Sequence, residues 1–281
     1  MNKILVPIHP HDNYTHTLSY ANFIAAKSGA GIHVCFLGKR RELKKQTNYD
    51  FGSDIEAVLE ACKHENFKKE ILTLCQDAQA KNLSLHFNFL AGRSVNEVIR
   101  ETFRNSYDMI VVGNREYKGI RTLLSEARVS KIIGQVSIPV FAVPMEQDFR
   151  SIDHITYAVD LTDYDPSIIK QVKSIARIFD ARLSITHVNR ETEIEKEKYM
   201  LALEKTISDT LDYPKVYYKF FDHADPLKGI LNFMKLNNSS MVAMISRTKF
   251  SWRQLLSPKS MTRLMSREVS VPILAFGKAK S

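Results

Sequence analysis

The chain has 281 residues, of which 44% are hydrophobic and 25% are charged. This balance is ordinary for a folded globular protein and argues against long disordered regions, and the length favours two domains of roughly 150 residues each. Forty Lys and Arg residues against 31 Asp and Glu residues give a net charge of +9, which favours weak association with anionic partners.

Several classes of protein are disfavoured by the same composition. The basic residues are scattered without aromatic residues between them, as in Lys39-Arg40-Arg41, so we expect a solvated surface and no specific nucleic-acid recognition. Cys35, Cys62 and Cys75 have no CxxC spacing, which indicates reduced and mostly buried thiols. No apolar run approaches the ~18 residues of a membrane span. We therefore expect a cytoplasmic protein with no membrane partner.

The first half of the chain alternates strands and helices. A β-rich run, Lys3 to Ile8, is followed by a helix pattern, Tyr14 to Ser28, and by a second strand, Ile32 to Leu37. This order predicts a right-handed unit with parallel strands. A polar connection, Gly38 to Ser53, and a long amphipathic helix, Asp54 to Ala78, come next. The remaining elements are a third strand (Ser84 to Leu90), a helix (Val95 to Phe103), a fourth strand (Asp108 to Val112), a helix that starts near Thr122, and a closing strand (Ile138 to Val143).

The second half repeats this order after a short charged linker, Met145 to Ser151. Its strands and helices alternate in the same way, and its apolar strand runs again lack the alternation of a half-exposed sheet, which is typical of parallel strands covered on both faces. The predicted strands are Ile155 to Asp160, Leu183 to Val188, Val216 to Phe221, Ser240 to Met244, and Val271 to Phe276. The predicted helices are Ile168 to Phe179, Tyr199 to Leu211, Leu227 to Met234, and Lys259 to Arg267.

The two halves keep a common register. Asp160 follows His9 by 151 residues, whereas Ser240 follows Asp108 by only 132. The second copy therefore lacks about 19 residues, and we place the loss in the long basic connection after the second strand, because loops tolerate such changes. Repetition at this length indicates duplicated domains.

Four short motifs point to one family. They are Ile4-Leu5-Val6-Pro7, the Gly92-Arg93-Ser94 turn before a helix, Asp108 to Gly113, and Ile138-Pro139-Val140. With them, residues 3–144 and 155–276 resemble two tandem universal stress protein domains. We expect a first domain over residues 1–144, a linker over 145–151 and a second domain over 152–281.

The resemblance implies an α/β fold of two doubly wound domains, each a five-stranded parallel sheet flanked by helices, of the kind called adenine nucleotide alpha hydrolase-like. It further implies a pseudo-two-fold between the domains, pairing through their closing strands, and a role in stress survival. Some members bind ATP. They carry an Asp after the first strand and, after the fourth, the pattern Gly-x-x-Gly, nine residues, Gly, Ser or Thr. Such glycines let backbone N–H groups approach phosphates.

The first copy departs from the ATP-binding pattern. His9 stands where the Asp is expected, and Gly113 keeps the first glycine position. Glu116 and Glu126 replace the second and third glycines, and Ala127 replaces the hydroxyl residue. Two carboxylates near a triphosphate would repel it. We therefore expect a degenerate site in the first half.

The second copy departs in another way. Asp160 is present, but Ile245 replaces the first glycine and brings a bulky side chain to a place where close backbone approach is needed. Arg247, Lys259 and Ser260 supply side-chain donors instead, with Lys259 and Ser260 at the end of the pattern after a one-residue insertion. Such donors suit an anionic group. These four polar residues are the candidate ligand site.

Two other polar clusters have simpler explanations. His9, His11 and His16 lack a fourth ligand at an obvious spacing, so we expect a polar loop and no metal site. His187 and Asp163, with Ser167 or Ser260, suggest a hydrolase triad, but the chain contains no G-x-S-x-G nucleophile elbow. We expect no catalytic residues.

The sequence thus predicts a non-catalytic stress-response binding or scaffold protein without a cofactor. The expected interactions are intramolecular pairing of the two domains, with a homodimer, an unknown protein partner or a small anionic ligand as further partners. The alternative is an ATP- or ADP-binding stress regulator, in the extreme a slow ATPase, that uses the second half. A weaker alternative is an anion- or nucleic-acid-associated protein that acts through its charge.

Overall fold

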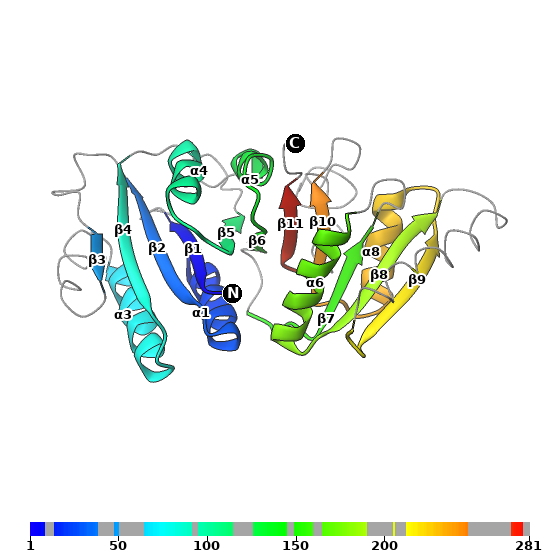
Figure 1. Ribbon diagram of the computed structural model, residues 1–281, viewed down its shortest axis with the longest axis horizontal. Helices are drawn as coiled ribbons and strands as arrows, with labels where there is room; N and C mark the ends of the chain where they lie inside the picture. Colours follow the sequence, from blue (N-terminus) through cyan, green and yellow to red (C-terminus); the bar gives the residue numbers. More distant parts are fainter. Residues whose placement is uncertain are drawn as a thin grey trace. The chain divides into compact units, whose positions relative to one another are not determined.

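The computed structural model describes residues 1–8, 14–38, 48–50, 65–91, 95–114, 126–144, 149–159, 165–189, 205, 212–246 and 271–277. The chain divides into two compact units, Met1–Phe149 with Gly277–Ser281, and Arg150–Phe276. Each unit contains a sheet with helices packed against it (Figure 1). The predicted α/β fold is confirmed by this arrangement.

The sheet of the first unit is parallel apart from one short strand. Its order is β3-β4-β2-β1-β5-β6, and β3 alone runs antiparallel to its neighbour. Ile4, Leu5 and Val6 in the first strand are all 0% exposed, as the apolar run without alternation predicts. The bounds are β1 Lys3–Ile8, β2 Gly31–Gly38, β3 Asn48–Asp50, β4 Leu85–Ala91, β5 Met109–Asn114 and β6 Val140–Pro144.

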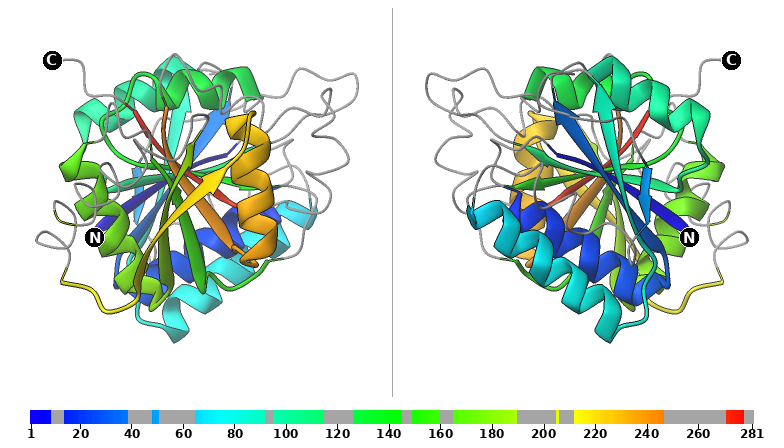
Figure 2. Two further views of the ribbon diagram at one scale, coloured as in Figure 1. Left: turned by 90° about the vertical axis from the view of Figure 1, so that its right-hand side faces the viewer. Right: turned by 90° about the vertical axis from the view of Figure 1, so that its left-hand side faces the viewer.

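Helices cover both faces of this sheet. Figure 2 shows α1 and α3 on one face and α4 and α5 on the other. The bounds are α1 Thr15–Ser28, α3 Glu65–Ala80, α4 Val95–Arg104 and α5 Glu126–Ile133. Phe149, from the predicted linker, packs against α1, where its ring centroid lies 4.9 Å from that of Tyr20 and 5.1 Å from that of Phe23.

The second unit repeats the architecture. Its strand order is β11-β10-β7-β8-β9, and α6 and α8 lie on opposite faces of the sheet (Figure 2). The bounds are β7 His154–Ala158, α6 Pro166–Phe179, β8 Arg182–Asn189, β9 Val216–Asp222, α8 Pro226–Leu236, β10 Met241–Ser246 and β11 Ile273–Gly277. The helices predicted over 199–211 and 259–267 lie outside the described residues, except that Lys205 is helical.

Helices α6 and α8, which the structure describes in the second unit, each begin with an Asp-Pro pair. Asp165 caps α6 by accepting a hydrogen bond from the Ser167 N–H at 2.9 Å, and Asp225 caps α8 by accepting from the Leu227 N–H at 2.9 Å. The proline that follows each Asp has no N–H to leave unsatisfied and its φ already suits a helix. The local sequence therefore sets where these helices start.

Backbone hydrogen bonds preserve the predicted repeat. The Gly31 N–H donates to the Asn2 carbonyl at 2.8 Å, and the Arg182 N–H donates to the Asp153 carbonyl at 2.9 Å. The donor and the acceptor of the second bond each lie 151 residues after their counterparts in the first, as the repeat predicts. The same strand junction is thus built twice from backbone groups alone.

The change of register falls where the sequence places it. Ile32 pairs with Leu85 and Leu183 pairs with Val216, so the offset drops from 183 − 32 = 151 to 216 − 85 = 131 between these strands. In the first unit the longer connection contains β3, which pairs antiparallel with β4. We predicted only a polar connection there, and that was wrong, because a strand of three residues has no periodicity to detect.

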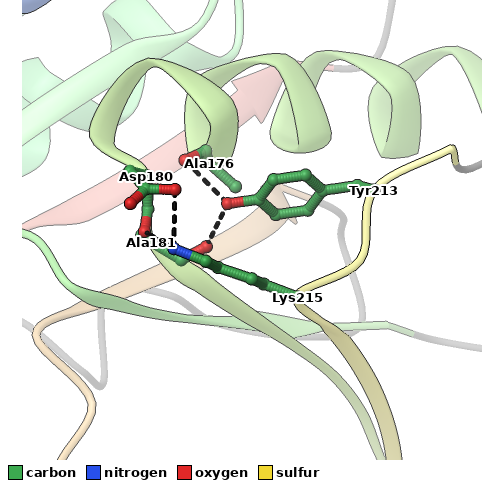
Figure 3. Close-up of polar contacts among 5 residues, drawn as sticks. All are labelled: Ala176, Asp180, Ala181, Tyr213 and Lys215. Atoms are coloured by element: carbon green, nitrogen blue, oxygen red, sulfur yellow. Dashed lines mark hydrogen bonds and ion pairs between the residues drawn. The ribbon is translucent and has the colours of Figure 1, made fainter.

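A polar clasp holds the carboxyl end of α6 (Figure 3). The Tyr213 hydroxyl donates to the carbonyl of Ala181 at 2.6 Å and to that of Ala176 at 3.3 Å. Lys215 Nζ donates to Asp180 Oδ1 at 2.6 Å. Asp180 ends the helix with φ 55°, a left-handed conformation that Gly29 (φ 73°) adopts at the end of α1. The clasp therefore stabilises a helix end that lacks glycine.

Replacing Tyr213 with phenylalanine is expected to lower the free energy of unfolding of the second unit by about 1 kcal/mol. The ring stays in place, while the Ala181 carbonyl loses its hydroxyl donor. Urea unfolding measures the change. Tyr217→Phe is the matched control, since Tyr217 is 48% exposed, and equal losses in the two variants would contradict the assignment.

Candidate functional site

The candidate site of the first unit lies at the carboxyl ends of β1 and β5, where parallel α/β sheets bind ligands. Gly113 is buried within β5 and pairs with Val143 of β6. We predicted that the strand would end at Val112, but it continues to Asn114. Gly113 therefore has strand backbone and does not form a left-handed turn.

Helix α5 contains two of the predicted site residues. Glu126 and Ala127 are the first residues of this helix that the structure describes. Both therefore have helical backbone, at the positions where we predicted a degenerate ATP-binding pattern.

A second carboxyl group lies near the same edge, on helix α3. Glu70 of α3 accepts a hydrogen bond through Oε1 from the Thr15 hydroxyl in the first turn of α1. Burial raises the pKa of Glu70, while the bond from Thr15 and the charge of nearby His16 oppose that shift. The first turn of α1 has no acidic residue of its own, and the Tyr14 side chain does not cap the helix. Glu70 thus brings a carboxyl group from another helix to the start of α1.

Glu70 was not found from the sequence. It lies 55 residues from Thr15, on a helix whose amphipathic pattern predicts only which residues face the core. The contact adds a further carboxyl group close to the carboxyl end of β1.

In the second unit, Val159 is the residue before Asp160 and lies at the carboxyl end of β7. Its N–H donates to the Thr186 carbonyl at 2.9 Å, and its own carbonyl lies 3.0 Å from His187 Nδ1. A carbonyl only accepts, so Nδ1 of His187 carries the proton. The two bonds to β8 fix the backbone from which Asp160 follows. Sequence analysis considered His187 only as part of a hydrolase pattern.

The fourth strand of the second unit also runs further than predicted. β10 extends to Ser246, so Ile245 has strand backbone, as Gly113 has in β5. The isoleucine is therefore compatible with the local backbone, and its effect on a ligand comes from the bulk of its side chain.

The remaining predicted site residues fall outside the part of the chain that the structure describes. They are His9, Glu116, Asp160, Arg247, Lys259 and Ser260. Within the described residues, no group of three or more His, Cys, Asp or Glu side chains is arranged to hold a metal ion. Cys35 and Cys75 are free and buried, as predicted, and burial raises the pKa of the Cys75 thiol to about 12.

The fold defines an α/β protein with mostly parallel strands and flanking helices. The model of the universal stress protein family matches residues 1–144, and this chain belongs to that family. No curated protein matches the chain in sequence.

Solved structures extend the likeness over both units. A universal stress protein from Archaeoglobus fulgidus matches with a TM-score of 0.66 and 19% identity, covering 99% of this chain and 98% of that one. A putative universal stress protein from Pseudomonas aeruginosa matches with a TM-score of 0.63 and 18% identity over 99% and 93%. The cytoplasmic domain of a prokaryotic cation chloride cotransporter matches with a TM-score of 0.59 and 11% identity over 100% and 97%. At these identities the likeness shows the fold.

Among the described helices, none combines the length and the apolar character that crossing a membrane requires.

Proposed function

We propose that this protein is a non-catalytic stress-response binding or scaffold protein whose nucleotide site is degenerate in both halves. The observation that carries the proposal is the placement of Glu126 and Ala127 in helix α5, where a phosphate-binding turn needs a glycine and a hydroxyl. Glu70 of α3 supports it, because its carboxyl group bonds to Thr15 at the start of α1. A phosphate ligand would meet carboxyl groups where it needs hydrogen-bond donors.

One observation favours a second candidate, an ATP- or ADP-binding regulator that uses the second half and in the extreme hydrolyses ATP slowly. Val159 is held to β8 on both sides, so Asp160 follows from an ordered strand end. In this proposal Asp160 contacts the ribose, and Arg247, Lys259 and Ser260 hold phosphate groups by charge-assisted hydrogen bonds. Each such bond contributes about 1.5–3 kcal/mol.

The proposal also covers the organisation of the chain. We take residues 1–144 and 152–281 as the two domains and 145–151 as their linker, and we propose that the domains pair within one chain through their closing strands. A homodimer through the same strands is the alternative. The proposed location is the cytoplasm, and the charge of +9 gives at most non-specific, salt-sensitive association with nucleic acid.

Calorimetric titration with ATP, ADP and inorganic phosphate is expected to show no saturable binding to the wild type up to about 1 mM, which corresponds to less than about 4 kcal/mol of binding free energy. The variants Lys259→Glu and Glu116→Gly with Glu126→Gly locate any binding that does occur. Binding lost in Lys259→Glu would replace the scaffold proposal with the second candidate. Binding that survives Lys259→Glu but changes in the first-half double variant would contradict both.

A further inference from the structure

A buried histidine forms the centre of the junction between β7, β8 and the turn that joins α8 to β10. His154 is 3% exposed, and both of its ring nitrogens have hydrogen-bond partners. Nδ1 lies 2.8 Å from the Asn237 carbonyl, and Nε2 lies 2.8 Å from the hydroxyl oxygen of Ser184. Since the carbonyl only accepts, Nδ1 carries the proton and Nε2 accepts from Ser184. The geometry therefore fits a neutral imidazole.

Two further bonds of this turn reach the start of β7. Ser240 Oγ accepts from the backbone N–H of His154 at 2.9 Å, and Ser239 Oγ lies 2.6 Å from Thr156 Oγ1. Residues 237–240 are thus held to β7 by a small polar network, in which the ring of His154 is the ionisable side chain.

A second proton on His154 would disrupt this network. Nε2 would become a donor, so the Ser184 hydroxyl would have to turn and accept, and a full positive charge would be enclosed in the core. Burial lowers the pKa of His154, and the positive charges of Arg182 and Lys219 act in the same direction. The hydrogen bond to Asn237 and the charge of Asp153 oppose it. Burial is the largest of these effects.

We propose that His154 makes the second unit acid-sensitive, because protonation of its ring loosens the turn between α8 and β10 from strand β7. At the position equivalent to His154 the first unit has Lys3, which is exposed. Mild acid would then act on one half of the duplicated chain. In a stress-response protein this is a built-in means of changing one unit while the other keeps its fold.

The sign of the pH effect follows from proton binding. In the unfolded chain this histidine titrates near its ordinary value of about 6.5, whereas in the folded unit it binds a proton only at lower pH. The stability that the neutral ring contributes is therefore complete above about pH 6.5. It falls as the pH drops below that value, by up to about tenfold in the unfolding equilibrium constant per pH unit.

Hydrogen exchange of the whole protein at pH 7.5 and pH 5.5 tests the proposal. Protection factors, corrected for the intrinsic effect of pH, are compared between peptides covering residues 230–242 and the equivalent first-unit peptides covering 98–110. We expect protection of the turn to drop by about tenfold at the lower pH and that of the first-unit peptides to drop less. An equal drop in both units would overturn the proposal without the use of any variant.

Two variants distinguish the effect of the charge on the His154 ring from the effect of losing a hydrogen bond in the network. His154→Gln should remove the drop in protection between the two pH values. Thr156→Val removes the bond to Ser239 but no ionisable group, so it should lower protection at both pH values while keeping the wild-type pH dependence. A wild-type pH dependence in a folded His154→Gln protein would contradict the role of the ring. If this variant does not fold, the wild-type comparison between the units decides.

Discussion

Replacing Gly229 with valine is expected to destabilise the second unit by about 3 kcal/mol. Gly229 is buried in α8, and a Cβ added there would lie 2.6 Å from Val188 Cγ1 and 2.9 Å from His223 Cβ. Neither atom moves easily, because one belongs to a β-branched side chain and the other is attached directly to the backbone. Overpacking of this kind typically costs 1–3 kcal/mol, with larger values for larger side chains.

The gain in helix propensity on replacing Gly229 opposes this clash but is smaller. Glycine in a helix interior costs about 1 kcal/mol relative to alanine, so a gain in helix propensity offsets part of the clash. Gly229→Ala should therefore destabilise less than Gly229→Val, by about 1 kcal/mol net. Urea unfolding of both variants measures this order. Either variant more stable than the wild type would show that α8 shifts freely on β8.

A neighbouring position gives the control. Lys228 is exposed in the same helix, so Lys228→Val tests helix propensity without a clash and should cost about 0.5 kcal/mol. The offset of 132 that relates Asp108 to Ser240 places Glu97 at the position equivalent to Gly229. The first unit therefore has a larger side chain where α8 has glycine.

The second large expected effect is slow amide exchange in the closing strands β6 and β11. The Ile110 N–H donates to the Pro139 carbonyl at 3.0 Å, and the Val242 N–H donates to the Pro272 carbonyl at 3.1 Å. In a strand the backbone groups of successive residues point to opposite edges. The N–H groups of Val140 and Ala142, and those of Ile273 and Ala275, therefore face away from the neighbouring strand of their own unit.

If the closing strands pair with each other, as we propose, these four outward N–H groups are expected to exchange about a thousandfold more slowly than exposed amides, which corresponds to a local opening free energy of about 4 kcal/mol. Residue-resolved hydrogen exchange by NMR makes the measurement. An unpaired apolar edge would also promote aggregation, so pairing has a physical advantage.

The inward N–H groups of Phe141 and Leu274 are the internal control, because they face β5 and β10 and should be protected in any case. Fast exchange at Val140 and Ala142 beside slow exchange at Phe141 would refute the pairing. Gel filtration distinguishes the two forms of pairing, since the intramolecular form elutes as one chain and the homodimer as two.

Much of the fold was predictable from the sequence because its causes are local. The apolar runs at Ile4 to Val6 and in β5 show no alternation, and strands buried on both faces have that pattern. The Asp-Pro pairs before α6 and α8 cap their helices through contacts two residues apart. The repeat offset of 151 survives as equivalent backbone hydrogen bonds, because both copies build the same strand junction.

The candidate site was predictable only in part. Sequence reasoning placed Gly113 near the end of β5 and Glu126 and Ala127 in α5, and these residues lie there. The predicted ends of β5 at Val112 and of β10 at Met244 were both too early. A parallel strand can continue as long as its neighbour offers hydrogen bonds, and local sequence does not reveal where that neighbour ends.

Other features were decided by the tertiary structure alone. Strand β3 exists because β4 offers it an edge, although Asn48 and Asp50, two of its three residues, have little intrinsic preference for a strand. Glu70 lies 55 residues from the helix end that it serves, and His154 lies 83 residues from the carbonyl of Asn237. Polar groups inside a protein need partners, and the folded chain supplies those partners from whatever segments its packing brings together, so their identity follows from the three-dimensional arrangement and not from sequence spacing.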